Sequence, residues 1–139
     1  MFIYQKSARY FAQVAAGFES ITVEELQKIG VRHIQPGFRG VYFSADPGML
    51  YLINYQSRLI SHVLAPLASF KCRDRDDLYR GGKTIEWPSL FSCDHTFGII
   101  ANVSANENIR HSKFAALCLK DAVADLFKQV QQKTQCGFL

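Results

Sequence analysis

The chain has 139 residues, 48% of them hydrophobic, and a formal net charge of +4. This length and composition suit one packed domain or two small ones and exclude a disordered or fibrous protein. The charge is compatible with a polyanionic partner without being diagnostic, and no stretch approaches the roughly twenty apolar residues of a membrane span.

The first half of the chain alternates strand and helix patterns. Gly17 and Gly30 end the first strand and the first helix, and Asp46-Pro47 is typical of a helix start. Pro66 interrupts the last strand, which implies an edge position or a bulge. The predicted elements are a strand at 10–16, a helix at 18–29, a hairpin at 31–38 and 40–44, a helix from 46 to about 58 and a strand at 62–70. This β-α-β-β-α-β order predicts a ferredoxin-like, α+β fold.

The second half predicts two helices and one strand. The charge run 73–77 predicts a helix capped by Asp76 or Asp77, followed by a connector at 85–91 that packs the only Trp. Alternating apolar residues predict a strand at 95–105. A long helix is expected at 111–130, and the residues after Lys133 are too few for another strand and helix.

The long helix is predicted to have two faces. Helical spacing predicts an apolar stripe that faces a core. The stripe consists of Ala115, Leu119, Ala122, Val123, Leu126 and Val130. Cys118, on the flank of the stripe, is read as a small apolar residue. Lys113, Lys120 and Lys128 lie on the opposite face. The polar turn at 106–113 precedes the helix start, where unpaired N–H groups favour an anion, although surface helices commonly carry lysines without binding one.

Catalytic motifs are missing from the sequence. The acidic residues are isolated or lie in the exposed run 73–77, and the four histidines are unpaired. Gly81-Gly82 resembles a phosphate-binding loop only superficially, because the surrounding motif is absent. The cysteines form no C-x-x-C pair and no signal peptide is visible, so we expect a reduced, cytoplasmic protein without a metal site. A self-contained enzyme is the weaker interpretation.

Several segments together carry a family resemblance over residues 10–127. They are 11–19, 40–43, 55–59 followed by Pro66-Leu67, 77–79 with 85–87, and most specifically 108–114 with 119–125. In this order and spacing the chain resembles the N-terminal region of THUMP-domain RNA methyltransferases. The closest type is the bacterial and cyanobacterial enzymes that methylate the exocyclic amine (N2) of a guanine in large-subunit ribosomal RNA.

The resemblance implies a ferredoxin-like subdomain at 9–70 and a THUMP core at 71–139, incomplete at its C-terminal end; a profile boundary could start near 48. It implies an RNA-binding module whose partners are RNA, ribosomal in this type, and a methyltransferase domain in the same protein, with no membrane association. The candidate RNA contacts are Asn108, Arg110, Ser112, Lys113 and Lys120, with Arg58, Arg73, Arg75, Arg80 and Lys83 as weaker ones.

The chain also departs from the family pattern. It contains no S-adenosylmethionine loop and no Asn-Pro-Pro-Tyr motif, so no cofactor is expected here and S-adenosylmethionine is implied only for the missing catalytic domain. Two alternatives remain open. One is a THUMP module of a tRNA-modifying enzyme that thiolates or methylates tRNA, and the other is a regulatory ferredoxin-like domain that binds a small ligand or pairs with itself.

Overall fold

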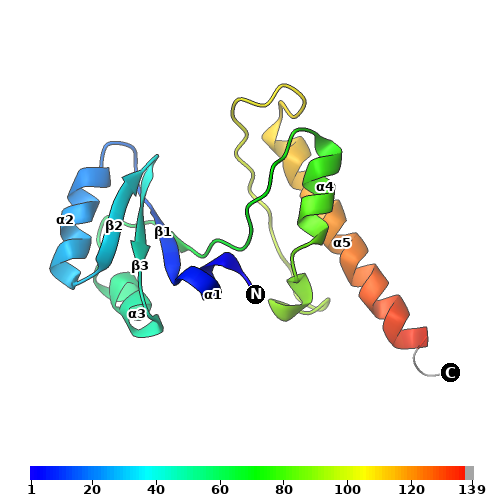
Figure 1. Cartoon of the computed structure of the whole chain (residues 1–139), viewed down its shortest axis with the longest axis horizontal. Helices are drawn as coiled ribbons and strands as arrows, with labels where there is room; N and C mark the ends of the chain where they lie inside the picture. Colours follow the sequence, from blue (N-terminus) through cyan, green and yellow to red (C-terminus); the bar gives the residue numbers. More distant parts are fainter. Residues whose placement is uncertain (137–139) are drawn as a thin grey trace. The chain divides into compact units, whose positions relative to one another are not determined.

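The computed structural model describes residues 1–136, with side chains up to residue 133 (Figure 1). The chain divides between Ser69 and Phe70 into two units, which are described one at a time. No helix in the described part is long and apolar enough to cross a membrane.

The first unit is built on a four-stranded antiparallel sheet. Its strands are β1 (Arg9–Gln13), β2 (Arg32–Gly37), β3 (Gly40–Ser44) and β4 (His62–Leu64), in the order β2-β3-β1-β4. This is the order of a ferredoxin-like plait, so the predicted fold class is confirmed. β4 lies at an edge, as Pro66 predicted, but the strand ends before that proline.

Two helices pack on one face of this sheet. They are α2 (Glu19–Ile29) and α3 (Pro47–Gln56), as predicted apart from small shifts of their ends (Figure 1). Gly30 ends α2 with φ of 101°, and the Asp46 carboxylate accepts a hydrogen bond from the N–H of Met49 at 2.7 Å at the start of α3. The core between the layers consists of Ala12, Leu26, Val31, Val41, Phe43, Ala45 and Ile53.

Two local predictions for the first unit were wrong. Residues 3–7, for which no element was predicted, form α1 (Ile3–Ser7), and the N–H groups of Ile3 and Tyr4 donate to the carbonyls of Leu67 and Pro66 at 3.1 and 3.0 Å. β1 and β4 are shorter than expected, since a strand extends only as far as its neighbour pairs with it. Both errors come from partners distant in sequence.

The second unit contains α4 (Arg75–Lys83), a 3₁₀ turn η1 (Trp87–Ser89) and α5 (Ser112–Cys136). The cap of α4 was predicted wrongly: it is Asp74, whose carboxylate accepts from the N–H of Asp77 at 2.9 Å. Residues 95–105 form no strand, because no other segment among the described residues pairs with them. α5 confirms the predicted long helix and continues past residue 130. Residues 137–139, which include the end of the short tail expected after Lys133, lie outside the described part.

The buried face of α5 is narrower than predicted. Ala115, Ala122 and Val123 are buried, whereas the stripe residues Leu119 and Leu126 are half-buried and Val130 is 42% exposed. Cys118, expected on the flank, is 2% exposed and belongs to the centre of the face. Burial raises the pKa of its thiol, as for a core residue.

Candidate nucleic-acid interface

Two glycines of α4 allow neighbouring side chains to approach its backbone closely. A Cβ atom on Gly82 would lie 2.5 Å from Leu119 Cδ1 and 3.2 Å from Ala122 Cβ, and one on Gly81 would lie 2.3 Å from the Phe70 ring. Both glycines are buried near the end of α4. Gly82 therefore allows α4 to approach α5, and Gly81 leaves room for the Phe70 ring.

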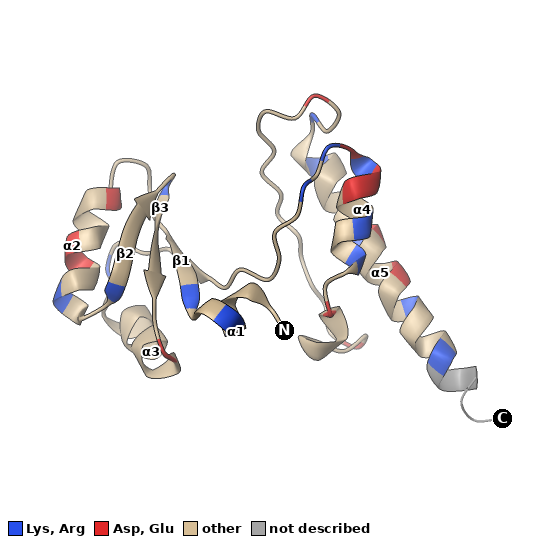
Figure 2. Cartoon of the chain, viewed as in Figure 1, with Lys and Arg blue, Asp and Glu red and all other residues tan. Residues whose placement is uncertain are grey.

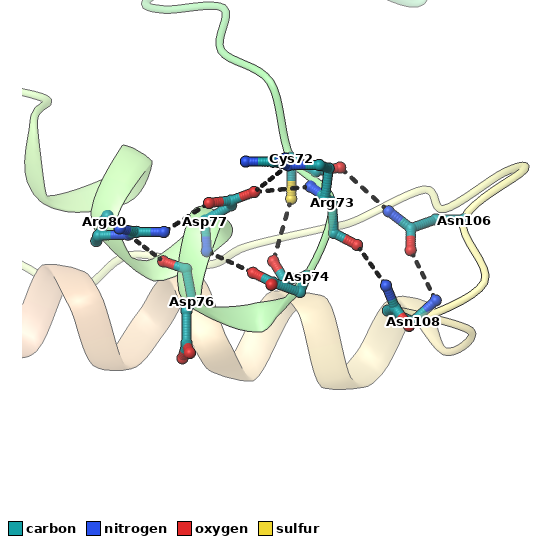
Figure 3. Close-up of polar contacts among 8 residues, drawn as sticks. All are labelled: Cys72, Arg73, Asp74, Asp76, Asp77, Arg80, Asn106 and Asn108. Carbon is teal, nitrogen blue, oxygen red and sulfur yellow. Dashed lines mark hydrogen bonds and ion pairs between the residues drawn. The ribbon is translucent and has the colours of Figure 1, made fainter.

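Two asparagines fasten the turn before α5 to the segment before α4 (Figure 3). The Asn106 side chain donates to the carbonyl of Cys72 at 3.2 Å, and the Asn108 side chain donates to that of Arg73 at 3.1 Å. Asn106 Oδ1 also accepts from the N–H groups of Asn108 and Ile109, at 3.0 and 2.9 Å. The beginnings of the two helices are therefore held together by side-chain amides.

Asp77 gathers two of the predicted arginines. Its Oδ2 accepts from the backbone N–H and Nε of Arg73 at 3.2 and 3.3 Å, and its Oδ1 from Arg80 Nη2 at 2.7 Å (Figure 3). These contacts, first the backbone N–H of Arg73, lower the pKa of Asp77 from its usual value. The two arginine side chains remain 85% and 72% exposed. The cluster thus presents two cations held by one carboxylate.

A polar groove of about 620 Å³ runs between α4 and α5, and we call it the α4–α5 groove. Tyr79 donates its O–H to Asp125 Oδ2 at 2.5 Å across the helix pair, and this hydrogen bond is the main cause of the raised pKa of Tyr79. Lys120 lies 3.7 Å from the carboxylate of Asp121. The lining consists of Arg75, Asp76, Tyr79, Lys120, Asp121, Ala124, Asp125 and Lys128.

The charges of this groove balance. Its cations are Arg75, Lys120 and Lys128, and three aspartates line it beside them. Figure 2 shows the same interleaving of blue and red along α4 and α5. The predicted basic face of α5 is therefore divided by carboxylates. Asp121 and Asp125 belong to α5 itself and follow from its helical spacing, whereas Asp76 comes from α4 and could not be placed by a helical wheel of α5.

The remaining predicted contacts lie in three places. Arg110, Ser112 and Lys113 are exposed around the start of α5, where Arg110 Nε donates to the carbonyl of Glu107 at 3.1 Å. Lys83 lies over the Tyr79 ring, 5.4 Å from its centre. Arg58 belongs to the first unit, after α3, whereas the other candidates belong to the second unit.

The sequence-based list of contacts contains only Arg75 and Lys120 of the eight residues that line the groove. It left out Lys128, although this residue follows Lys120 by two helical turns and was placed on the same face of the helix. Tyr79 and Asp125 could not be paired from the sequence, because 46 residues separate them. Among the described residues, no three His, Cys, Asp or Glu side chains gather as a metal site would require.

Comparisons with known proteins now decide the family. The RlmL ferredoxin-like domain model matches residues 9–64, and the THUMP domain model matches residues 72–135. The chain belongs to the THUMP-domain family. An RlmL-type ferredoxin-like domain precedes its THUMP domain, so the resemblance to the N-terminal region of THUMP-domain RNA methyltransferases is confirmed.

Longer proteins match most of this chain. A Synechocystis protein named "putative RNA methyltransferase" is 43% identical over 116 residues, which cover 84% of this chain and 30% of that protein. A Listeria monocytogenes structure titled as a predicted N6-adenine-specific DNA methylase has a TM-score of 0.76 at 21% identity, covering 92% of this chain and 33% of its own. A structure titled as a putative methyltransferase, SMU.472, complexed with SAH has a TM-score of 0.74 at 18% identity, covering 89% and 33%. The THUMP-family chain thus spans about a third of these relatives.

Proposed function

We propose that this chain is the RNA-binding part of an RNA methyltransferase and that it positions RNA for a catalytic domain elsewhere in the same protein. The pairing of an RlmL-type ferredoxin-like domain with a THUMP domain carries the proposal. The second unit also holds ten of the sixteen cations of the chain. Cations that face phosphates provide the sequence-independent part of RNA affinity.

The proposed contact surface has two parts. The first is the exposed arginine pair around Asp77, which the Asn106 and Asn108 amides place next to the start of α5. The second is the set of cations in the α4–α5 groove, where carboxylates alternate with them. Because the groove is charge-balanced, we expect few phosphates to enter it and most of the electrostatic affinity to come from the first part.

For the substrate, we propose a guanine N2 position in large-subunit ribosomal RNA, with S-adenosylmethionine bound by the catalytic domain in the same protein, in the cytoplasm. The motif resemblance at 108–114 and 119–125 and the name of the Synechocystis relative support an RNA target. The methyl donor rests on the family resemblance, because the SMU.472 structure with bound SAH is only 18% identical to this chain and supports the fold alone. The DNA-methylase title of the Listeria structure carries little weight for the target, because 21% identity supports the fold alone.

A salt titration of RNA binding tests this proposal. We expect the 139-residue chain to bind a ribosomal RNA hairpin at low salt. For each phosphate contacted, log affinity should fall by about 0.7 to 0.9 for every tenfold rise in salt concentration. Binding that is absent at low salt, or that does not respond to salt, would refute the proposal. Competition between tRNA and the ribosomal hairpin distinguishes the two kinds of target. The tRNA-modifying alternative predicts that tRNA displaces the hairpin.

One observation favours a small-ligand function, although in the second unit and not in the ferredoxin-like unit of the original alternative. A cavity of about 420 Å³ in the second unit is lined largely by apolar side chains, including Leu78, Ile99, Val103, Ile109 and Leu119. Pockets of this size and character can hold small molecules. That function predicts thermal stabilisation by a ligand in the absence of nucleic acid, whereas the RNA-binding function predicts stabilisation by RNA.

A further inference from the structure

The face of the sheet opposite α2 and α3 carries two aromatic rings side by side. Phe11 on β1 is paired in register with Tyr42 on β3, and the ring centres are 4.8 Å apart. Neither ring belongs to the core that the helices cover, and Tyr42 is 43% exposed. We call this surface, with its neighbours in register, the open sheet face.

The strand register aligns further side chains with the two rings. Gln35 on β2 pairs with Tyr42, and Leu64 on β4 pairs with Phe11, so one row crosses all four strands. Arg9 lies one row away on β1, and its guanidinium is 5.5 Å from the centre of the Tyr42 ring. Gln35 Oε1 accepts from Arg9 Nη2 at 2.6 Å and fixes the guanidinium in this position.

Glycines leave room for the rings to lie along the sheet. A Cβ atom on Gly40 would lie 2.1 Å from Phe11 Cζ, and one on Gly37 would lie 2.9 Å from Tyr42 Cε2. The rings therefore lie over glycine backbone. This arrangement supports them from below and leaves the outer side of Tyr42 accessible.

The charge of this face suits a polyanion. The four strands contain no Asp or Glu, and they contain Arg9 and Arg32 (Figure 2). At the β2–β3 turn, Arg39 lies 5.6 Å from the centre of the Phe38 ring, which is 87% exposed. Among the described residues, Arg9 has no carboxylate partner, so its charge remains available.

We infer that the open sheet face binds unpaired RNA bases by stacking them on Tyr42 and Phe11, while Arg9 contacts the backbone. Aromatic residues on the central strands of a four-stranded sheet are an established way to hold single-stranded RNA. The inference rests on the proposed RNA binding and adds a second contact surface, in the ferredoxin-like unit, that selects single strands. A protein partner fits less well, because Leu64 is the only exposed aliphatic side chain in the row that contains the rings.

Substitution of Tyr42 tests the inference. Fluorescence anisotropy of the 139-residue chain is measured with a labelled, unstructured RNA of about eight nucleotides, a length within the usual range of such sites, and with a duplex of equal length. We expect Tyr42→Leu to weaken single-strand binding about tenfold and to leave duplex binding and the salt slope unchanged, because the ring is uncharged. Tyr42→Phe keeps the stacking ring and should bind like the unmodified chain.

Tyr55→Leu is the matched control. Tyr55 is 88% exposed and lies on α3, in the helical layer on the other side of the sheet, so its loss should leave both affinities unchanged. Equal effects of Tyr42→Leu and Tyr55→Leu would overturn the inference, and so would unchanged single-strand binding by Tyr42→Leu. If Tyr42→Leu instead abolished a dimer seen in sedimentation and left RNA binding intact, the face would be a self-association surface.

A second measurement does not depend on any variant folding. RNA containing 5-iodouridine is crosslinked by light to the unmodified chain, and we expect attachment to Tyr42 or Phe11. Crosslinks confined to the second unit would overturn the inference and leave the proposed function intact. A chain that binds no RNA at any salt concentration would overturn both.

Discussion

The side-chain amides of Asn106 and Asn108, which we call the amide clamp, hold the starts of α4 and α5 together and give the sharpest test of the second unit. Asn106→Ala removes three hydrogen bonds: one to the carbonyl of Cys72, and two from the backbone N–H groups of Asn108 and Ile109. A typical intramolecular hydrogen bond contributes about 0.5 to 1.5 kcal/mol, and Ile109 is buried, so its N–H would lose its partner away from water. With allowance for the exposed N–H of Asn108, the loss in unfolding free energy is about 2 kcal/mol.

Two further variants allow the expected losses in unfolding free energy to be ranked. Asn106→Asp keeps the acceptor for both N–H groups and loses only the bond to the carbonyl of Cys72, so its cost is about 1 kcal/mol. Asn108→Ala removes one exposed side-chain bond, to the carbonyl of Arg73, and should cost less than about 1 kcal/mol. The expected order of destabilisation is therefore Asn106→Ala first and Asn108→Ala last.

The single tryptophan makes the assay specific to this unit. Trp87 donates its indole N–H to the carbonyl of Gly82 at 2.8 Å and packs near Phe91, so its fluorescence reports unfolding of the second unit alone. Urea titrations give the unfolding free energy of each variant, and the variants are compared where this free energy depends on urea concentration with the same slope. If Asn106→Ala costs no more than Asn108→Ala, the clamp does not stabilise the unit and the reasoning is refuted.

Three further predictions concern the helix pair. Leu119→Ala should destabilise the second unit by about 2 kcal/mol, the low end for such changes, because Leu119 is only half-buried; Trp87 fluorescence in urea measures it. Asp77→Asn should destabilise at pH 7, and because folding lowers the pKa of Asp77, the difference from the unmodified chain should vanish as the pH falls through and below the usual carboxyl pKa, as thermal melts at several pH values would show. Lys120→Ala should weaken RNA binding modestly and change stability by less than about 0.5 kcal/mol, since Lys120 is 54% exposed; a large loss of stability would mean that this lysine is structural.

The fold was largely predictable because its signals are local. Gly30, Asp46-Pro47 and the apolar run at 41–43 each act on their own neighbours, and the helices and hairpin follow from them. The segment 95–105 has an equally clear alternation, yet it forms no strand among the described residues. A strand depends on a partner, and alternation alone does not supply one.

The candidate site was predictable only in part. The cations of α4 and α5 could be found from composition and helical spacing, and Arg73, Arg75, Arg80 and Lys120 do lie on this helix pair or at its edge. Asp76 was not expected to share their surface with α5, because that depends on the close packing at Gly82. Asp121 and Asp125 lie on α5 itself, so its helical spacing could have shown them. Whether the ten predicted residues contact RNA stays a prediction.

Salt dependence of RNA binding by a charge-neutralised variant tests the central claim most directly. Arg73→Gln combined with Arg80→Gln removes the two exposed guanidiniums around Asp77 and keeps polar side chains in their place. If these arginines face phosphates, the slope of log affinity against log salt should fall by about 1.4 to 1.8 relative to the unmodified chain, with weaker binding at low salt. An unchanged slope and affinity in a folded variant would contradict the account.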